Sequence, residues 1–180
     1  VPMALPTLTT PRLLLRDWKG EDADNLWEFA SNPLVGPSAG WQPHRSPGDS
    51  ARAMSLYRQM GVWAVALREG DKVVGTLELT DDRRRKGLRA MEIGYALSLD
   101  WWGAGLMTEA VRAAARYAFE VKGAQLVTAY CQPGNERSVR LLERCGFAYE
   151  GTLRGMYRRF DGEALDMRCY SVRPDEIKLK

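Results

Sequence analysis

The sequence has few of the residues that build metal centres or disulfide frameworks. Of its 180 residues, three are cysteines and one, His44, is a histidine. Cys131, Cys145 and Cys169 stand 14 and 24 residues apart, and no two of them form a Cys-x-x-Cys pair. Structural zinc sites usually draw on such pairs, and small disulfide-bonded domains contain more cysteine. The sequence therefore predicts no metal cofactor and no disulfide framework, which fits a reducing, cytoplasmic location.

Long apolar segments are missing as well. No uncharged apolar run approaches the roughly 18 to 20 residues that a membrane-spanning helix needs. The first residues also lack the basic and apolar regions of a signal peptide. We therefore expect no membrane partner. Val1 and Pro2, which precede Met3, are consistent with an expression remnant.

An excess of one charge is also lacking. The formal net charge is only +3, and 45% hydrophobic with 27% charged side chains is ordinary for one globular domain, here residues 1–180. The one sharp basic cluster is 83–86 (RRRK), which predicts a solvated hairpin loop because like charges repel one another into water. An accessory protein that contacts RNA through this loop is an alternative. One short loop is a small electrostatic footprint, so nucleic acid is not expected as a partner.

The first half of the chain predicts strands with helices between them. The Glu69-Gly70-Asp71 segment is interpreted as a hairpin turn. A helix is predicted from Asp22 to the Asn32-Pro33 pair, and another over 50–60. The segment 35–47 between these helices contains two glycines and three prolines and is predicted to be a loop. Strands are predicted from short apolar runs at 13–15, 63–67, 72–79 and 91–99.

The second half predicts a β-α-β crossover. Apolar residues recur at three- and four-residue spacing from Met107 to Val121, and a central strand follows at 126–131. Such a crossover implies a parallel pair of strands. Asn135 is predicted to cap a helix that Gly146 ends. Strands at 156–160 and 164–172 flank Asp161-Gly162 and predict a closing hairpin.

A glycine turn joins strand 91–99 to the helix that follows. The first N–H groups of a helix have no intrahelical partners and its dipole favours negative charge, so Gly103 and Gly105 mark a generic anion site. A P-loop is excluded because no lysine follows Gly105 at the required place. A dinucleotide fingerprint is excluded because Thr108 stands where its third glycine is needed. By itself, such a glycine pair is more often only a tight turn.

Five blocks in a fixed order over residues 88–147 resemble the GNAT acetyltransferases, and most closely the branch of the RimJ and RimL ribosomal-protein N-acetyltransferases. Any one block alone is weakly specific, whereas the order and spacing of all five are highly specific. Weaker resemblance extends to 10–13 (TPRL) and 150–154 (EGTLR). The five blocks are 92–97 (EIGYAL), 102–110 (WGAGLMTEA), 117–119 (YAF), 135–140 (NERSVR) and 145–147 (CGF).

Three positions depart from the general pattern of the superfamily. Trp102 stands where most members have Gln or Arg, and Met107 where they have a small residue. These two departures resemble the RimJ and RimL branch. Leu142 stands seven residues after Asn135, where many members place a tyrosine that acts as general acid. That tyrosine mechanism is therefore not expected here.

The resemblance implies an α/β fold with a mixed, mostly antiparallel sheet flanked by helices, and acetyl-coenzyme A (acetyl-CoA) as a substrate without a metal. The strand end at Ala96, Leu97 and Ser98 would pair with the pantetheine arm and offer an N–H to the thioester oxygen. Asn135 and Ser138 would contact the coenzyme. Arg140 and Arg144 either reach its 3′-phosphate or are ordinary exposed helix residues. The N–H groups expected to hold the pyrophosphate belong to Trp102, Gly103, Ala104, Gly105, Leu106, Met107 and Thr108.

Three side chains are candidates for the proton transfers of acetyl transfer. Neutralising an α-amine at pH 7 costs roughly 1.4 kcal/mol and neutralising a lysine roughly 4.6 kcal/mol, so an α-amine needs little help from a base. Glu92 resembles the strand glutamate that is the general base of several GNAT enzymes, and Glu78 is the second candidate. Ser138 resembles the proposed proton donor to the leaving thiolate. Each also suits an ordinary structural position, and His44 suits either a wall of the acceptor pocket or the surface.

The resemblance implies direct transfer to a primary amine in a ternary complex. A covalent acetyl-enzyme is disfavoured because no histidine is close in sequence to Cys131 to activate it. The branch implies a protein N-terminal α-amine as acceptor, and small amines such as aminoglycosides, polyamines or amino-acid derivatives are alternatives. A non-catalytic CoA-binding or sensing module would retain the same glycine turn and Asn135. The branch also allows a homodimer.

Overall fold

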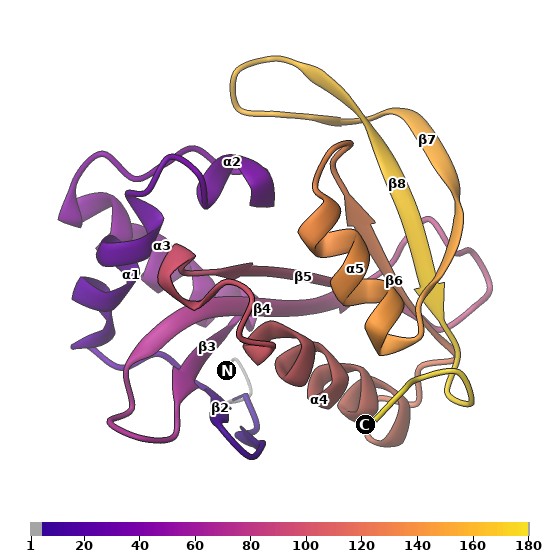
Figure 1. Cartoon of the computed structure of the whole chain (residues 1–180), viewed down its shortest axis with the longest axis horizontal. Helices are drawn as coiled ribbons and strands as arrows, with labels where there is room; N and C mark the ends of the chain where they lie inside the picture. Colours follow the sequence, from indigo (N-terminus) through magenta and orange to yellow (C-terminus); the bar gives the residue numbers. More distant parts are fainter. Residues whose placement is uncertain (1–4, 180) are drawn as a thin grey trace. The chain divides into compact units, whose positions relative to one another are not determined.

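The computed structural model describes residues 5–179, so Val1 and Pro2 lie outside the described residues. The strands of this described part form one open sheet in the order β1-β2-β3-β4-β5-β6-β8-β7 (Figure 1). Strands β5 and β6 pair in parallel, whereas β1–β2, β2–β3, β3–β4, β6–β8 and β7–β8 pair antiparallel. The predicted fold class, a mixed and mostly antiparallel sheet with helices, is therefore confirmed.

Contacts divide the chain into two compact units. The first unit contains the chain up to Glu78 together with Tyr95–Ala110, and the second contains Leu79–Gly94 together with the chain from Val111 onward. Strands β4 (Val73–Asp81) and β5 (Ala90–Leu97) and helix α4 (Leu106–Glu120) pass from one unit into the other. The expectation of a single domain over residues 1–180 stays a prediction.

The first unit is built on a core between two helices and the sheet. Leu26 and Phe29 of α1 and Met54 of α3 belong to one buried cluster with Ala64 and Ala66 of β3. Residues two apart on a strand share a face, so β3 presents these small alanines to the helices. The elements that lie wholly in this unit are β1 (Leu8–Thr9), β2 (Leu13–Arg16), α1 (Asp22–Ala30), α2 (Gly36–Ala39), α3 (Pro47–Met60), β3 (Trp63–Leu67) and the 3₁₀ turn η1 (Leu99–Trp101).

The segment 35–47 is not wholly a loop, which corrects the sequence prediction. It contains the four-residue helix α2, which ends at Gly40 with φ +94°. A Cβ on Gly36 would lie within 2.8 Å of the Trp41 side chain, so glycine there permits close packing. Helix α3 begins at Pro47, because Ser46 and Asp49 form a capping box in which each side chain accepts a backbone hydrogen bond from the other residue.

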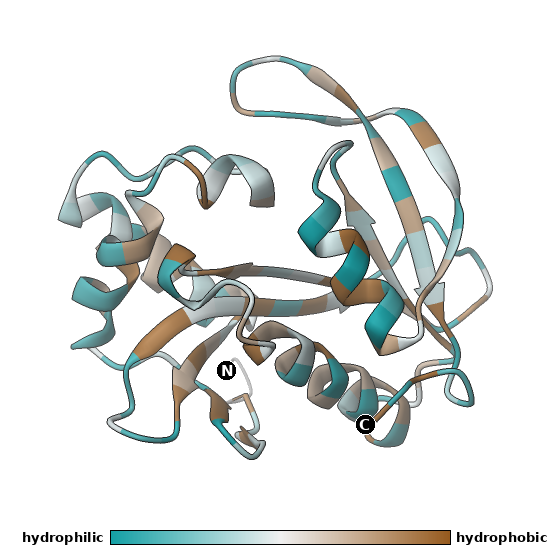
Figure 2. Cartoon of the chain, in the orientation of Figure 1, coloured by the Kyte–Doolittle hydropathy of each residue, from teal (hydrophilic) through white to brown (hydrophobic). Residues whose placement is uncertain are grey.

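The second unit contains the parallel strand pair. Strands β5 and β6 are in register from Ala90–Leu126 to Glu92–Thr128, so the predicted β-α-β crossover is confirmed. Helix α5 buries three side chains at helical spacing, Val139, Leu142 and Cys145, and Figure 2 shows hydrophilic and apolar residues alternating along it. The elements that lie wholly in this unit are β6 (Leu126–Cys131), α5 (Glu136–Cys145), β7 (Ala148–Arg158) and β8 (Ala164–Val172).

Strand β7 is longer than the sequence predicts, because it begins at Ala148 rather than at Met156. Its register against β8 shifts between Tyr149 and Gly151 and again between Leu153 and Tyr157. Each shift breaks the two-residue alternation that identifies a strand in a sequence. Among residues 5–179, no helix combines the length and the apolar character needed to cross a bilayer.

Candidate active site

A left-handed glycine turn in the first unit links β5 to α4. Gly103 and Gly105 have φ values of +80° and +76°, a conformation that other residues rarely adopt. A Cβ on Gly103 would meet nothing within 4 Å, so the backbone conformation rather than space favours glycine there. Successive backbone N–H groups in such a turn form a concavity that attracts anions. The predicted anion site is thus present as a backbone geometry.

Helix α4 begins immediately after this turn. Its first intrahelical hydrogen bond runs from the Glu109 N–H to the Gly105 carbonyl at 3.2 Å. The N–H groups of Leu106, Met107 and Thr108 come before it and therefore have no intrahelical acceptor. The side chains of Leu106 and Met107 are buried, which anchors this first turn of the helix. These backbone donors and the positive end of the helix dipole suit a pyrophosphate.

Not every N–H predicted to hold the pyrophosphate is equally available. The Trp102 N–H donates to the Leu99 carbonyl at 3.1 Å, and the Ala104 N–H donates to the Trp101 carbonyl at 3.4 Å. Both bonds lie within the turn itself. The donors best suited to an anion are therefore those of Gly103 and Gly105 and of the first turn of α4.

The end of β5 presents its backbone groups to two sides. The Ser98 N–H donates to the Val74 carbonyl of β4 at 2.8 Å. Because successive residues of a strand direct their N–H groups to opposite edges, the Leu97 N–H points away from β4. The Trp102 indole donates to the Leu97 carbonyl at 2.8 Å. Of the three residues predicted to meet the thioester, Leu97 is the one whose N–H is directed away from the neighbouring strand.

The start of α5 in the second unit confirms the predicted N-cap. The Asn135 side-chain oxygen accepts a hydrogen bond from the Ser138 N–H at 3.3 Å, and α5 begins at the residue after Asn135. Ser138 is half-buried, whereas Arg140 and Arg144 are exposed. Gly146 ends the helix with φ +95°, as predicted. The roles of these residues in coenzyme binding stay predictions.

Cys131, at the end of β6, is buried next to Ser138. Burial raises the pKa of the Cys131 thiol to about 11, and a hydrogen bond with the Ser138 side chain opposes this rise only in part. A thiol of this pKa is almost entirely protonated at neutral pH and is a poor nucleophile. Cys145 and Cys169 are also buried, and burial raises the pKa of each to about 11.

Glu92 lies in an ion-pair network that the sequence analysis did not predict. Its carboxylate accepts a hydrogen bond from Arg84 at 2.8 Å, and the Arg84 guanidinium lies 4.7 Å from the centre of the Tyr130 ring. The Tyr130 and Thr128 hydroxyls both donate to the buried carboxylate of Asp82 at 2.7 Å. The chain from Asp82 to Glu92 therefore holds the candidate base in one place.

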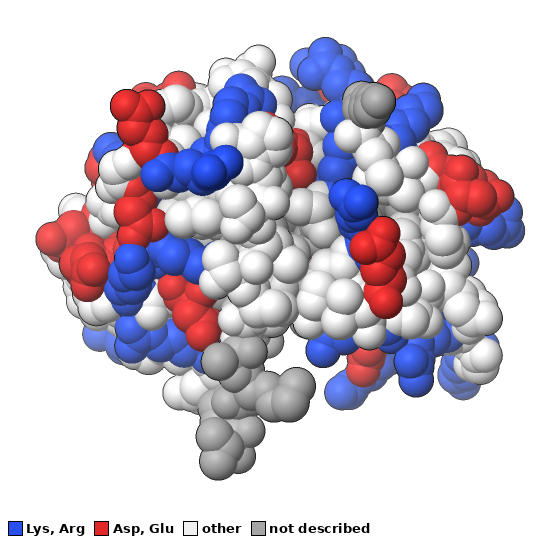
Figure 3. Space-filling view, turned by 90° about the horizontal axis from the view of Figure 1, so that it is seen from below, with Lys and Arg blue, Asp and Glu red and all other residues white. Residues whose placement is uncertain are grey.

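The same network corrects the interpretation of the basic cluster. Arg84 pairs with Asp82 and Glu92, and Arg85 pairs with Glu150, so the loop is not solvated throughout. The other two members of the cluster, Arg83 and Lys86, are exposed. Positive and negative side chains are interspersed on the face shown in Figure 3. The signal for this network in the sequence is Asp82 directly before the arginines.

Glu78, the second candidate base, is half-buried on β4 in the first unit. Burial and the negative charge of Glu78 together raise the pKa of Tyr57 to about 12, so the Tyr57 phenol is neutral at pH 7. The Tyr57 ring also packs 5.5 Å from the Trp18 ring. Glu78 is thus a carboxylate in an apolar and aromatic setting.

His44 is half-buried and well anchored. Its Nδ1 lies 2.8 Å from the hydroxyl of the buried Ser50, and its ring lies 5.4 Å from the Trp41 ring. Burial lowers the pKa of His44, although Asp49 opposes this, so the imidazole is neutral at pH 7. The interpretation of His44 as an ordinary surface histidine is therefore incomplete. Among the described residues, no cluster of His, Cys, Asp and Glu could hold a metal ion.

Comparison with known proteins supports the same type of site. Residues 12–148 match the family described as the Acetyltransferase (GNAT) domain. Over 174 residues, 93% of this chain, it is 32% identical to an uncharacterized N-acetyltransferase, p20, of Bacillus licheniformis, of which 96% is covered. Over 172 residues, 88% of this chain, it is 30% identical to the ribosomal protein uS5-alanine N-acetyltransferase of Escherichia coli strain K12, of which 86% is covered.

Solved structures share the fold. The crystal structure of a GNAT-family acetyltransferase from Bacillus anthracis has a TM-score of 0.84 at 22% identity, over 95% of this chain and 100% of that one. The ribosomal-protein-S5-alanine acetyltransferase from Vibrio fischeri has a TM-score of 0.74 at 22% identity, over 96% and 99%. The family match, the two sequence relatives and the glycine turn before α4 agree, and the chain therefore belongs to the GNAT family of acetyltransferases, which use acetyl-CoA.

Proposed function

We propose that this protein transfers the acetyl group of acetyl-CoA directly to the N-terminal α-amine of a protein. The observation that carries the proposal is the glycine turn, in which Gly103 and Gly105 direct backbone donors toward an anion at the start of α4. The acceptor class is supported by the 30% identity to the uS5-alanine N-acetyltransferase of Escherichia coli. An α-amine also needs less help from a base than a lysine does.

In the proposed reaction, the amine nitrogen forms a bond to the thioester carbonyl carbon and the carbon–sulfur bond breaks. The Leu97 N–H, directed away from β4, is the proposed donor to the oxyanion that develops on the carbonyl oxygen. The amine gives up its proton to a carboxylate, directly or through water. The leaving thiolate takes a proton from Ser138, whose hydroxyl is in contact with Cys131.

Direct transfer is supported by the state of Cys131. With a pKa of about 11, roughly one thiol in 10⁴ is ionised at pH 7. A covalent acetyl-enzyme on this residue would start from a nearly inactive nucleophile. The proposal is therefore a ternary complex of enzyme, acetyl-CoA and amine.

The two candidate bases differ in their surroundings. Glu92 is held by Arg84 at 2.8 Å, whereas Glu78 adds its charge to the neighbourhood of the neutral Tyr57. Glu78→Gln and Glu92→Gln separate them, because the variant that removes the base lowers kcat while its KM for acetyl-CoA stays near the wild-type value. If both variants keep wild-type kcat, water alone accepts the proton.

The test of the proposed function combines a binding and a turnover measurement. Acetyl-CoA is titrated into the protein by calorimetry, and free-thiol release is followed with peptides that begin with alanine or serine. The same peptides with a blocked N-terminus and an internal lysine serve as controls, beside a panel of polyamines and aminoglycosides. Release that requires a free N-terminus supports the proposal. Release only with small amines would replace the acceptor, binding without release would favour a sensing module, and absence of binding would refute the proposal.

A further inference from the structure

The turn between β1 and β2 holds the glycine turn from behind. Arg12 Nη1 donates to the Ala104 carbonyl at 2.9 Å, and Arg12 Nε donates to a Glu109 carboxylate oxygen at 2.9 Å. The Arg12 backbone N–H donates to the other carboxylate oxygen at 2.8 Å, which also accepts from the Thr10 hydroxyl. All these residues belong to the first unit. Arg12 is thus bonded both to the turn and to the first helical turn of α4.

The bond to Ala104 has a directional consequence. In a trans peptide the carbonyl and the following N–H point to opposite sides of the chain. When Arg12 holds the Ala104 carbonyl, the N–H of Gly105 is turned to the side away from Arg12. Gly105 has φ +76° and no side chain, so little else restrains this peptide plane. Arg12 therefore sets the direction of one of the donors best suited to an anion.

The bond to Glu109 has an electrostatic consequence. Burial would raise the pKa of Glu109, but the hydrogen bonds from Thr10 and from Arg12 outweigh burial and lower the pKa. Glu109 is therefore a carboxylate at pH 7. It stands in the first turn of α4, next to backbone donors that suit an anion. Without the Arg12 guanidinium, this negative charge would repel a phosphate group from the same helix start.

We infer that Arg12 is a positioning residue for the phosphate end of the acyl donor. Through Ala104 it orients the Gly105 N–H, and through Glu109 it balances the negative charge at the start of α4. The inference rests on the proposed function, because it takes the pyrophosphate of acetyl-CoA as the anion. Its action is confined to the phosphate end of the donor and does not reach the thioester.

The experiment compares two acyl donors that differ in this phosphate end. Acetyl-pantetheine carries the same thioester as acetyl-CoA but no pyrophosphate. Arg12→Met is expected to raise the KM for acetyl-CoA roughly 10- to 100-fold, the effect of losing charge-assisted hydrogen bonds. Its kcat at saturating acetyl-CoA and its KM for acetyl-pantetheine are expected to stay within twofold of wild type, as an order-of-magnitude limit. A merely structural role would change both donors alike.

A matched control comes from the same turn. Arg68 donates to the carbonyls of Thr10 and Pro11 at 3.2 and 3.3 Å, and among the hydrogen bonds of the described residues it has none to residues 102–109. Arg68→Met should therefore leave both KM values unchanged. Arg12→Lys keeps the charge but cannot make both bonds at once, so its KM for acetyl-CoA should lie between wild type and Arg12→Met.

Glu109 provides a second route to the same answer. In the double variant Arg12→Met/Glu109→Gln the repelling charge is gone, so the KM for acetyl-CoA should recover partly toward wild type. If Arg12→Met melts below the assay temperature, the Arg12→Lys and Glu109→Gln variants decide the question by the same comparison of donors. An equal change for both donors, or no change for either, would overturn the inference. If wild type itself fails to bind acetyl-CoA, the proposed function fails first, and the two failures are distinguishable.

Discussion

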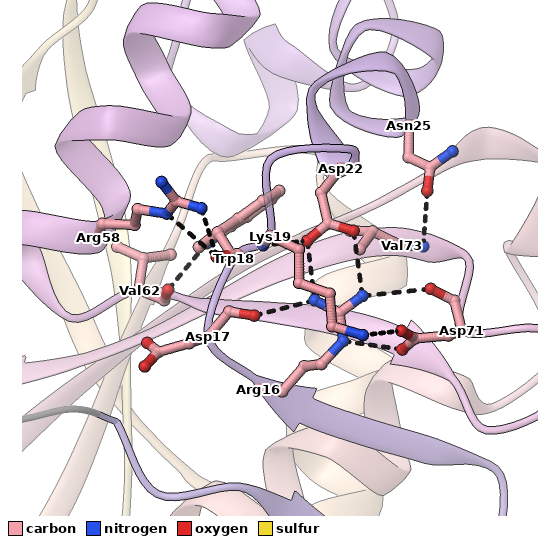
Figure 4. Close-up of polar contacts among 10 residues, drawn as sticks. All are labelled: Arg16, Asp17, Trp18, Lys19, Asp22, Asn25, Arg58, Val62, Asp71 and Val73. Carbon is pink, nitrogen blue, oxygen red and sulfur yellow. Dashed lines mark hydrogen bonds and ion pairs between the residues drawn. The ribbon is translucent and has the colours of Figure 1, made fainter.

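Arg16 and Asp22 form a two-point ion pair, in which Arg16 Nη1 and Nη2 donate to the two carboxylate oxygens at 2.8 and 3.0 Å (Figure 4). Both side chains are almost inaccessible, with 8% and 2% exposed. Arg16 Nε also donates to Asp71, in the turn between β3 and β4, at 2.8 Å. Because Arg16 ends β2 and Asp22 begins α1, one guanidinium joins three segments of the first unit.

Arg16→Met is expected to destabilise the protein strongly. It leaves the buried Asp22 carboxylate without its partner, which typically costs about 3 to 5 kcal/mol. Urea unfolding followed by tryptophan fluorescence measures the change. Lys72→Met is the control, because its pair with Glu28 is about half exposed and contributes less than about 1 kcal/mol. Equal losses in the two variants would show that the Arg16 network does not stabilise the fold.

Asp82→Asn is expected to reduce stability in a pH-dependent way. Burial would raise the pKa of Asp82, but hydrogen bonds from Tyr130, Thr128 and Arg84 outweigh burial and lower the pKa. A carboxyl with a lowered pKa contributes stability that is present above its unfolded value of about 3.9 and is lost as the pH falls through the folded value. At pH 7 the variant should lose about 2 kcal/mol. Below about pH 4 its difference from wild type should shrink.

Unfolding in urea at a series of pH values tests this expectation. The exposed Asp175→Asn variant is the control and should differ from wild type by less than about 0.5 kcal/mol at every pH. A constant difference between Asp82→Asn and wild type from pH 7 to pH 3 would contradict the assigned role of the charge.

Gly146→Ala is expected to be more harmful than Gly87→Ala. Both glycines have positive φ, +95° and +76°, so each alanine costs about 1 to 2 kcal/mol in backbone strain. A Cβ on Gly87 would meet nothing within 4 Å, whereas one on Gly146 would lie 2.3 Å from the Glu176 carbonyl oxygen. The melting temperature should therefore fall further for Gly146→Ala. Similar melting temperatures would show that the chain at Glu176 yields easily.

Ser138→Ala and Cys131→Ala are expected to have opposite effects on turnover. Removing the proposed proton donor should lower kcat by about 10²-fold, whereas removing a thiol that is protonated at neutral pH should change kcat by less than about threefold. Initial-rate patterns of intersecting lines in the Cys131→Ala variant would agree with a ternary complex. A loss of all activity in a folded Cys131→Ala variant, with parallel lines in wild type, would instead indicate an acetyl-enzyme.

Local signals in the sequence were enough to predict much of the fold. Asn135 and Gly146 bound α5 as predicted, since capping and left-handed glycine act within a few residues. The pattern from Met107 onward identified α4 and with it the β-α-β crossover. Short elements were missed where several residues share one contact, as in α2, where Trp41 packs on Gly36.

The sequence by itself determined the family and the position of the glycine turn, because both depend on the order of residues along the chain. Tertiary structure alone decided what surrounds the chemistry. Arg12 meets Glu109 across 97 residues, and Asp82 meets Tyr130 across 48. Pairings at such separations depend on the register of strands and the packing of helices, which no local pattern encodes. The partners of the candidate groups, and hence their charge states, therefore became visible only once the chain was folded.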